Sequence, residues 1–352
     1  MTDTLRYYLA LDSGLAVMRG RGDSLESVGE FFPDAVIDDL AGSRVRPEVV
    51  FAAALQHGAL RTRDAGRTWE RVFDGSVHTI AVDPHDDDVV YLGTSPVRLY
   101  RSEDGGTTWE PLDGLLDVPA HVKTKWGAPA VLPGEIAHVR YIFIHPEDRN
   151  LLFVLLEHGG VLRSADRGAT WTDCTEGIAY VDMHMIANAP GSKDRYYVTS
   201  ARGFFRSDDR GDRWQRVERG MPWGGTEKYS YSHDLCVVSG ASPRLVLSYG
   251  RGSPGVWTEE RSEIGGHILL SEDGAASWRA SRGIDPRSMP WALARHPTDA
   301  QTLYCGAGGY RGFVPYPTGA RGALYRSRDA GETWDPITGE MPAILEAWVA
   351  PD

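Results

Sequence analysis

The sequence predicts an all-β protein, folded as a seven-bladed β-propeller whose blades are four-stranded antiparallel sheets. Three observations predict this fold. The 352 residues include 40 glycines, 21 prolines and 11 tryptophans, which suits many short strands joined by tight turns rather than long helices. One octapeptide recurs six times along the chain. The two ends of the chain each carry part of a further repeat.

The octapeptide has the pattern S/T-x-D-x-G-x-x-W, with Ala275 in place of the glycine in one copy. The copies cover residues 62–69, 102–109, 164–171, 207–214, 271–278 and 327–334. The aspartate can accept hydrogen bonds from backbone N–H groups of a turn, the glycine permits positive φ, and the tryptophan can pack one hairpin on its neighbour. Tight-turn chemistry accounts for these residues fully, so we expect them to be structural.

This pattern resembles the Asp-box, or BNR, repeat of sialidases, sortilin-type receptors and photosystem assembly factors, and it covers nearly the whole chain. The resemblance implies a propeller. It does not choose among sialidases, xyloglucan-cleaving glycosidases, sorting receptors and photosystem II stability factors. Sialidases are six-bladed and carry an Arg-Ile-Pro-like motif with three substrate-binding arginines. No such motif stands near the start of this sequence, so their catalytic residues are not carried over.

Further strand signals precede each octapeptide. In one clear copy, residues 77–82 are followed by an Asp-Pro turn, strands at 89–92 and 98–101, the octapeptide, and a last strand at 109–112. This is the four-stranded blade of a propeller. The sequence therefore predicts one domain over residues 1–352, with blades at about 35–73, 76–112, 135–174, 180–217, 231–281, 289–338, and 344–351 together with 6–28.

The seventh blade is expected to be composite. Residues 344–351 have the pattern of a first strand without the other strands of its blade after it. The N-terminal segment supplies three strand signals, at 7–11, 15–18 and 24–28. An inner strand from the C-terminus and three outer strands from the N-terminus would close the ring and leave no open sheet edge at the junction.

The net charge, the apolar stretches and the cysteines disfavour several classes of protein. The formal charge of −12 disfavours a general binder of nucleic acid or of anionic membranes. Residues 1–16 lack the pattern of a secretory signal, and no stretch has the roughly 18 apolar residues that a membrane span needs. Cys174, Cys236 and Cys305 are far apart within strand-like runs, so we expect buried free thiols. A cytoplasmic protein fits these features.

Propeller topology assigns the starts of the inner strands to one face, called here the upper face, and the octapeptide turns to the opposite, lower face. Four long connections map to the upper face, at 113–134, 218–230, 250–266 and 306–322. Their basic and aromatic residues predict a mouth for an anionic or aromatic small molecule, although an ordinary solvated loop surface is the alternative. The predicted substrate-binding residues are Trp126, Trp223, Tyr229, Arg251, Trp291 and Tyr310.

Histidines gather on the same face. His78, His184 and His233 occupy one register at the starts of inner strands. Arg140 holds this register in the third blade, where His138 lies two residues earlier. Converging imidazoles would repel one another if protonated, and a divalent metal removes this conflict because neutral imidazole is its commonest ligand. We predict a divalent transition-metal site (Zn, Fe, Cu, Mn or Ni) formed by these four histidines. The alternative is that each histidine only hydrogen-bonds a neighbouring blade.

Acidic residues complete the predicted site. Asp182, Asp234 and Glu346 lie near inner-strand starts, where they could orient metal ligands or act as a general base. Arg140 could orient a carboxylate or phosphate of the substrate. Asp38 and Asp39 of the first blade are placed on the opposite rim. The predicted catalytic set is therefore Arg140, Asp182, Asp234 and Glu346.

These residues support three hypotheses. The leading one is a metal-dependent hydrolase, lyase or oxygenase that acts on a small, anionic or aromatic molecule at the upper face. The alternative is a non-catalytic propeller that binds a protein partner or a glycan. A metal-free glycoside hydrolase, with two of the carboxylates flanking the scissile bond, is a further alternative. The sequence leaves the substrate, the metal and the oligomeric state open.

Overall fold

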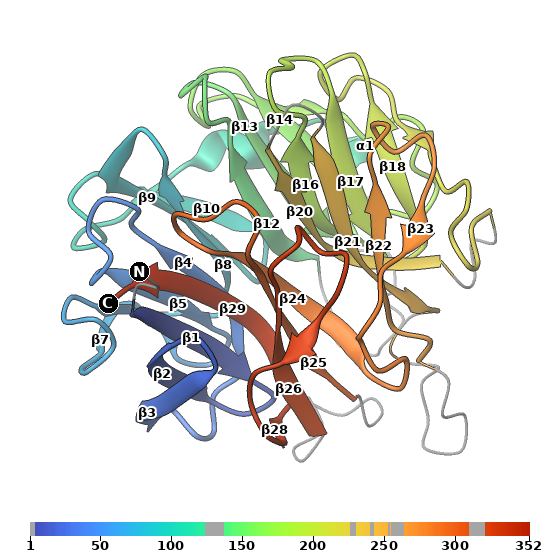
Figure 1. The fold of residues 1–352 in the computed structure, drawn as a ribbon. Coiled ribbons are helices and arrows are strands. Elements are labelled where there is room, and N and C mark those ends of the chain that lie inside the picture. The colour runs from blue at the N-terminus through green and yellow to red at the C-terminus, as the bar shows by residue number, and fades with distance from the viewer. Residues whose placement is uncertain are drawn as a thin grey trace.

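The protein is a ring of seven antiparallel sheets around a central axis and is built almost entirely from strands (Figure 1). The computed structural model describes residues 4–123, 137–225, 230–239, 243–252, 254, 264–309 and 321–352. Six sheets are continuous in sequence, and the seventh joins the two ends of the chain. The predicted fold class and the closure of the ring by both terminal segments are therefore confirmed.

Blades 1 to 6 follow one another along the chain, and in each blade the strands run from the axis outward. Blade 1 consists of β4 (Ile37–Gly42), β5 (Val50–Ala54), β6 (Gly58–Thr62) and β7 (Glu70–Phe73). Blade 2 consists of β8 (Val77–Asp83), β9 (Asp86–Thr94), β10 (Arg98–Ser102) and β11 (Glu110–Pro111). Blade 3 consists of β12 (His138–Ile144), β13 (Leu152–Glu157), β14 (Gly160–Ser164) and β15 (Thr172–Asp173).

The second half of the ring repeats this plan. Blade 4 consists of β16 (Met183–Asn188), β17 (Tyr196–Ser200), β18 (Gly203–Ser207) and β19 (Gln215–Arg216). Blade 5 consists of β20 (Ser230–Val238), β21 (Arg244–Arg251), β22 (His267–Ser271) and β23 (Arg279–Ala280). Blade 6 consists of β24 (Met289–Arg295), β25 (Leu303–Gly308), β26 (Arg321–Ser327) and β27 (Asp335–Pro336), and β28 (Met341–Pro342) also pairs with β26.

Blade 7 is the composite blade, in which the C-terminal β29 (Ile344–Pro351) is the inner strand. The outer strands are β1 (Leu5–Leu11), β2 (Leu15–Arg21) and β3 (Ser24–Phe31). β29 pairs antiparallel with β1, from Leu5 opposite Pro351 to Leu11 opposite Ile344, so the two ends of the chain lie side by side (Figure 1). All residues of β1 are buried, because a second strand of a blade is covered on both faces.

The hydrophobic core lies between neighbouring blades. Between blades 2 and 3 it also takes in residues of the connecting segment, whose two short helices are η1 (Asp113–Asp117) and α1 (Ala120–Lys123). Leu115, Val118 and Val122 of this segment are buried against the two sheets. The three cysteines are buried and free, as the sequence predicts. Within the part of the chain that the structure describes, no helix is long and apolar enough to cross a membrane.

The octapeptide turns carry the expected hydrogen bonds. Asp104 Oδ1 accepts the backbone N–H groups of Thr107 and Thr108 at 2.9 and 2.8 Å, and Oδ2 accepts the Thr108 hydroxyl at 2.7 Å. These bonds stabilise the ionised form and hold the pKa of Asp104 below its usual range. The sequence accounts for positive φ at the fifth position, but the fourth residue adopts it too. This holds even where that residue has a side chain, as in Ala65 (φ 60°) and Arg167 (φ 61°).

A ring of arginines joins the blades near the lower face. At six of the seven blade interfaces, one arginine Nη1 donates a hydrogen bond to a backbone carbonyl in the outer turn of the next blade. In each case the accepting residue has a positive φ, so this turn conformation presents its carbonyl to the neighbouring blade. The pairs are Arg6–Ala65, Arg61–Gly105, Arg163–Arg210, Arg206–Gly274, Arg244–Ala330 and Arg326–Gly22.

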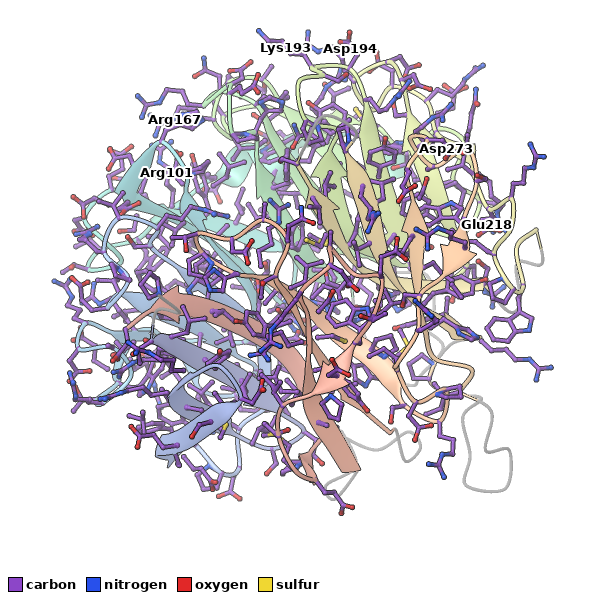
Figure 2. All side chains as sticks on the ribbon, in the orientation of Figure 1. Arg101, Arg167, Lys193, Asp194, Glu218 and Asp273 are labelled. Carbon is purple, nitrogen blue, oxygen red and sulfur yellow. The ribbon has the colours of Figure 1, made fainter. Side chains whose placement is uncertain are left out.

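The interface between blades 2 and 3 differs. Arg101 holds the same sequence position as Arg206, and both side chains pair with an acidic residue two positions later, at 3.2 Å to Glu103 and 3.0 Å to Asp208. Among the described contacts, however, Arg101 makes no bond to the backbone carbonyl of Arg167 in blade 3. Figure 2 labels Arg101 and Arg167 at the same edge of the view. This interface therefore lacks the arginine bond that joins the other blades.

Arg206 and Arg101 provide a matched test of the bonds between blades. Their side chains are 21% and 20% exposed, respectively, so replacing either by methionine removes a similar surface ion pair. We expect Arg206→Met to lower the free energy of unfolding by about 2 kcal/mol more than Arg101→Met, because only Arg206 bonds a carbonyl of the next blade, at 3.0 Å. Urea denaturation of both variants measures the difference. Equal losses would contradict the proposed role of the arginine ring.

Candidate functional site

The upper end of every inner strand contains a β-bulge. The register of each inner strand with its neighbour shifts near its start, which leaves an extra residue on the inner strand. A bulge turns the side chain of the extra residue away from the regular alternation of the sheet. The bulges contain Asp38, His78, Arg140, His184, His233 with Asp234, Trp291 and Leu345, in the order of blades 1 to 7. We call the region enclosed by these residues the axial mouth.

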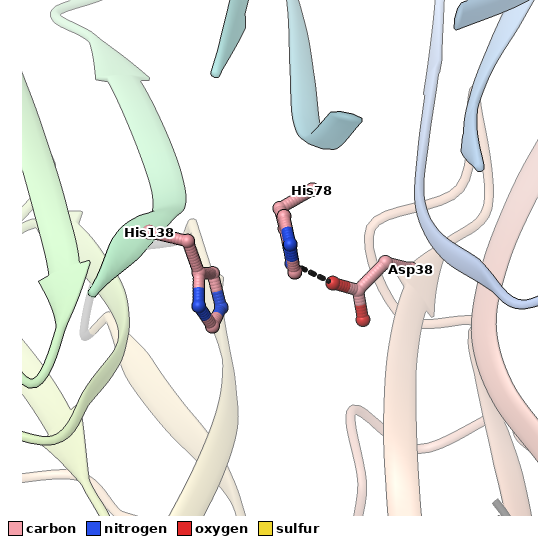
Figure 3. A group of neighbouring side chains, drawn as sticks. All are labelled: Asp38, His78 and His138. Atoms are coloured by element: carbon pink, nitrogen blue, oxygen red, sulfur yellow. Dashed lines mark hydrogen bonds and ion pairs between the residues drawn. The ribbon is translucent and has the colours of Figure 1, made fainter. Parts of the chain in front are cut away.

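Blades 1 to 3 bring one group of side chains together at this mouth (Figure 3). His78 Nδ1 donates to Asp38 Oδ2 at 2.9 Å, and the rings of His78 and His138 stack with centroids 3.8 Å apart. His138 Nε2 lies 3.2 Å from Glu157 Oε2, because the register of β12 with β13 sets these two residues directly opposite each other. Arg140 Nε lies 3.8 Å from the same carboxylate oxygen.

Burial and neighbouring charges shift the pKa values of the two carboxyls and the two histidines in this group. Burial acts against the ionised form of Asp38, but the positive charge of Arg140 and the bond from His78 outweigh it and lower the pKa of Asp38. Glu157 is also buried, and the neighbouring charges of His138 and Arg140 lower its pKa. Burial lowers the pKa of His78, whereas Glu157 overcomes burial and raises the pKa of His138. The group thus contains two carboxylates held ionised at neutral pH.

Blades 4 and 5 use their histidines differently. His184 Nδ1 donates to the Ser232 carbonyl at 2.6 Å, and His233 Nδ1 donates to the Trp291 carbonyl at 3.0 Å. Each of these bonds joins one inner strand to the next. The predicted set of four histidines is therefore divided: His78 and His138 face Asp38, while His184 and His233 bond backbone groups.

A second group of carboxyls lies around the axis. Asp39 Oδ2 accepts the Ile80 N–H at 3.0 Å, and Asp234 Oδ2 accepts the Leu293 N–H at 2.6 Å, so each aspartate bonds the backbone of the following inner strand. Glu346 Oε1 accepts the N–H of Ala347 at 2.9 Å. All three side chains are half-buried.

These carboxyls retain protons more strongly than ordinary ones. Burial raises the pKa of Asp39 and that of Asp234 to about 6. Burial, and then the negative charges of Asp234 and Asp39, raise the pKa of Glu346 well above its usual range. Burial raises the pKa of Tyr141, and the negative charges of the same three carboxyls raise it further. A carboxylic acid and a carboxylate can therefore coexist here at neutral pH.

The other predicted residues have varied positions. Asp182 Oδ1 lies 3.5 Å from His184 Nε2, away from the contacts of Glu346 and Asp234. Trp291 is only 6% exposed and meets the ring of His233 edge-on at 5.1 Å, so it forms a wall of the mouth rather than an open stacking surface. The Arg251 backbone N–H donates to the Ile264 carbonyl at 2.8 Å at the end of β21. Trp126, Tyr229 and Tyr310 lie outside the described residues.

Trp223 belongs to an upper connection that a buried glutamate holds in place. Glu218 accepts hydrogen bonds from the backbone of Phe204 at 3.0 Å and of Gly225 at 2.7 Å, and from the Ser230 hydroxyl at 2.6 Å. Figure 2 labels this residue near the outer side of the ring. The indole of Trp223 stacks on Tyr249 with centroids 5.9 Å apart. Trp223 is therefore fixed against blade 5 and lies outside the groups around Asp38 and Glu346.

Sequence reasoning missed Glu157. This residue ends β13, on the second strand of blade 3, and the sequence analysis considered only inner strands and long connections. Its position opposite His138 follows from hairpin register, so pairing the two strands residue by residue would have found it.

No protein-family model matches the chain. The oligoxyloglucan-reducing end-specific xyloglucanase of Emericella nidulans is 25% identical over 229 residues, which cover 60% of this chain and 25% of that protein. A xyloglucanase of Paenibacillus sp is 23% identical over 363 residues, covering 88% of this chain and 31% of that protein. The chain thus spans about a quarter to a third of the length of these relatives.

Solved structures show the same fold. The GH74 enzyme of Niastella koreensis superposes with a TM-score of 0.63 and 14% identity, over 85% of this chain and 45% of that chain. YCF48 bound to D1 peptide superposes with a TM-score of 0.53 and 17% identity, over 86% of this chain and 82% of that chain. One of these structures is an enzyme and the other is bound to a peptide, so the similarity supports the fold and does not indicate a function.

The relatives contradict the leading hypothesis from the sequence, a metal-dependent enzyme that acts on a small anionic molecule. They are named as xyloglucanases, which are glycoside hydrolases. The axial mouth supplies a physical reason for this correction. Asp38 and Glu157 are held ionised near Arg140, so their negative charges offset its positive charge and disfavour an anionic ligand.

The proximity of Asp234 and Glu346 can be tested by titration. Replacing Asp234 by asparagine removes a negative charge that raises the pKa of Glu346, so we expect the pKa of Glu346 to fall in Asp234→Asn. Carbon-13 NMR of labelled glutamate carboxyls across the pH range measures this change. Asp182→Asn is the control, because Asp182 contacts His184 instead. An unchanged pKa of Glu346 in Asp234→Asn would show that the two carboxyls do not interact.

Proposed function

We propose that this propeller is a glycoside hydrolase that acts on a neutral oligosaccharide of the xyloglucan type at the axial mouth. The observation that carries the proposal is the pair formed by Asp234 and Glu346. Their pKa values are raised to different extents in one half-buried site, and such a pair supplies the acid and the base that glycoside hydrolysis requires. The xyloglucanase relatives support the same class of reaction.

In this proposal Glu346 is the general acid. Its carboxyl stays protonated at neutral pH because it is buried and lies near other negative charges, so it can protonate the leaving oxygen of the glycosidic bond. One of its oxygens is held by the Ala347 N–H at 2.9 Å, which orients the group.

Asp234 is the second carboxyl of the pair. Above a pH of about 6 it is ionised, and it then assists the attack on the anomeric carbon from the opposite side of the sugar. Its two oxygens accept the N–H groups of Leu235 at 2.7 Å and Leu293 at 2.6 Å, which fix its position between the inner strands of blades 5 and 6. A fixed carboxylate loses little conformational freedom in the reaction.

The charge of the mouth supports a neutral sugar as substrate. Carboxylates accept hydrogen bonds from sugar hydroxyl groups, and the ionised Asp38 and Glu157 disfavour anionic ligands. A small oligosaccharide fits a cytoplasmic protein, a location that we also propose because all three cysteines are buried thiols without disulfides. We further assign the octapeptide to the Asp-box superfamily, which the matching hydrogen bonds in its six turns support.

Activity assays test this function. We expect the wild-type protein to release reducing ends from xyloglucan oligosaccharides, and Glu346→Gln or Asp234→Asn to lower kcat/KM by about 10²- to 10⁴-fold while the circular dichroism spectrum is unchanged. Asp182→Asn, a half-buried carboxyl at the same face, should retain most of the activity. Binding of the oligosaccharide without cleavage by any variant, including wild type, would instead favour the non-catalytic alternative.

The pH dependence of the reaction follows from the two carboxyls. Asp234 must be ionised, so activity should rise as the pH increases through about 6. Glu346 must be protonated, so activity should fall again at higher pH as this raised carboxyl loses its proton. A profile of kcat/KM against pH measures both limbs. An acidic limb near 4, the ordinary value of an aspartate, would contradict the assignment of Asp234.

A further inference from the structure

Three side chains from three consecutive blades meet at one side of the axial mouth (Figure 3). Asp38 comes from blade 1, His78 from blade 2 and His138 from blade 3, and in each case the residue lies at the upper start of its inner strand. One carboxylate oxygen and one nitrogen of each ring all lie within 4.8 Å of one another. The three side chains are 12–13% exposed, so the group is largely shielded from bulk solvent.

The donor types match a late first-row transition metal. Two imidazoles and one carboxylate form a mixed nitrogen and oxygen set that suits Zn²⁺ and its neighbours better than Ca²⁺ or Mg²⁺, which prefer oxygen ligands alone. Asp38 supplies a negative charge that offsets the charge of the ion. Three protein ligands leave a further position for water, so the set need not be completed by the residues of other blades.

The spacing is close to that of a formed site. Two atoms that each lie about 2.1 Å from the same metal ion are about 3–4 Å apart. His78 Nδ1 and Asp38 Oδ2 lie 2.9 Å apart through a hydrogen bond, so an ion bound by both atoms would replace the Nδ1 proton, which is released to solvent. The rings of His78 and His138 are stacked at 3.8 Å with 25° between their planes. Because the nitrogen lone pairs lie in the ring planes, an ion would turn one ring out of this stack and bring its nitrogen toward the other two donors.

Glu157 provides the outer partner that such a site uses. Its carboxylate lies 3.2 Å from Nε2 of His138. A carboxylate behind a metal-bound histidine fixes the tautomer and the orientation of its ring. The opposing register of β12 and β13 sets this contact, so it does not depend on an ion being present.

We propose that Asp38, His78 and His138 bind one divalent transition metal, with Zn²⁺ as the reference ion, and that this ion joins blades 1, 2 and 3. The site is independent of the hydrolytic pair Asp234 and Glu346. It also differs from the four-histidine centre, because the Nδ1 atoms of His184 and His233 are engaged by the carbonyls of Ser232 and Trp291.

The location gives the ion a structural role. Blades 2 and 3 form the interface at which Arg101 makes no bond to the next outer turn among the described contacts. His78 and His138 belong to these two blades and face each other at the upper end of the same interface. A metal bond between the blades would therefore reinforce the ring where the arginine bond is missing, and its binding energy would add to the stability of the folded state.

Metal titration of the purified full chain tests the proposal. After dialysis against a chelator, the protein is titrated with ZnCl₂ by isothermal calorimetry, and its melting temperature is measured with and without the ion. Co²⁺ absorption reports the ligand types independently. We expect one Zn²⁺ per chain and a higher melting temperature, and we expect the affinity to fall by roughly 100-fold or more in a His78→Ala, His138→Ala variant.

A matched variant separates this site from the rest of the mouth. His184→Ala, His233→Ala also removes two axial histidines, and it should bind one Zn²⁺ as the wild type does. Asp38→Asn, which preserves side-chain size, should weaken binding even if the double alanine variant fails to fold. Absence of stoichiometric binding in the wild type, or equal binding in Asp38→Asn and wild type, would overturn the proposal.

Discussion

The bulge at the start of each inner strand is the constraint on which the axial mouth depends. A regular strand would direct successive side chains alternately into the two blade interfaces. The extra residue breaks this alternation at the upper end of every inner strand, so the corresponding sequence positions of the seven blades lie around the axis at one face. At the lower face, repeated aspartate turns and, at six of the seven interfaces, arginine bonds fix the outer turns. The outer turns of the lower face therefore repeat from blade to blade, whereas the side chains at the upper starts of the inner strands differ.

The guanidinium of Arg140 acts on carboxyls on several sides of the mouth. Arg140 lowers the pKa of Asp38, and it partly opposes the effect of burial on Asp234 and Glu346. Carboxyls near it, such as Glu157, stay ionised, while those that burial dominates keep protons to higher pH. Burial and the neighbouring positive charges therefore divide the carboxyls into two protonation classes within this region. This sorting is what makes acid and base chemistry available to the proposed hydrolase.

The sequence predicts the fold well because each blade repeats the same short signals. The octapeptide fixes the outer turns, and the pattern at residues 344–351 predicts that the two ends of the chain share a blade. The shared register of His78, Arg140 and His184 also corresponds to the bulges.

The partners of those residues could not be predicted in the same way. Whether His184 meets another histidine or the Ser232 carbonyl depends on the distance and rotation between blades, and strand periodicity contains neither quantity. The bonds of the arginine ring could not be predicted from the sequence for a similar reason, because their acceptors are backbone carbonyls of turns rather than side chains. The repeat predicts which blade a residue belongs to and at which face it lies. Its side-chain contacts with the next blade depend on how the two blades pack.

The measurement that tests the account most directly is a crystal structure of Glu346→Gln soaked with a xyloglucan oligosaccharide. The variant should bind the sugar without cleaving it. The account predicts sugar density across the axial mouth, with a glycosidic oxygen beside residue 346 and the carboxylate of Asp234 on the opposite side of the ring. Sugar bound only at the lower face or on the outer edge of the blades would contradict the assignment of the axial mouth as the site of hydrolysis.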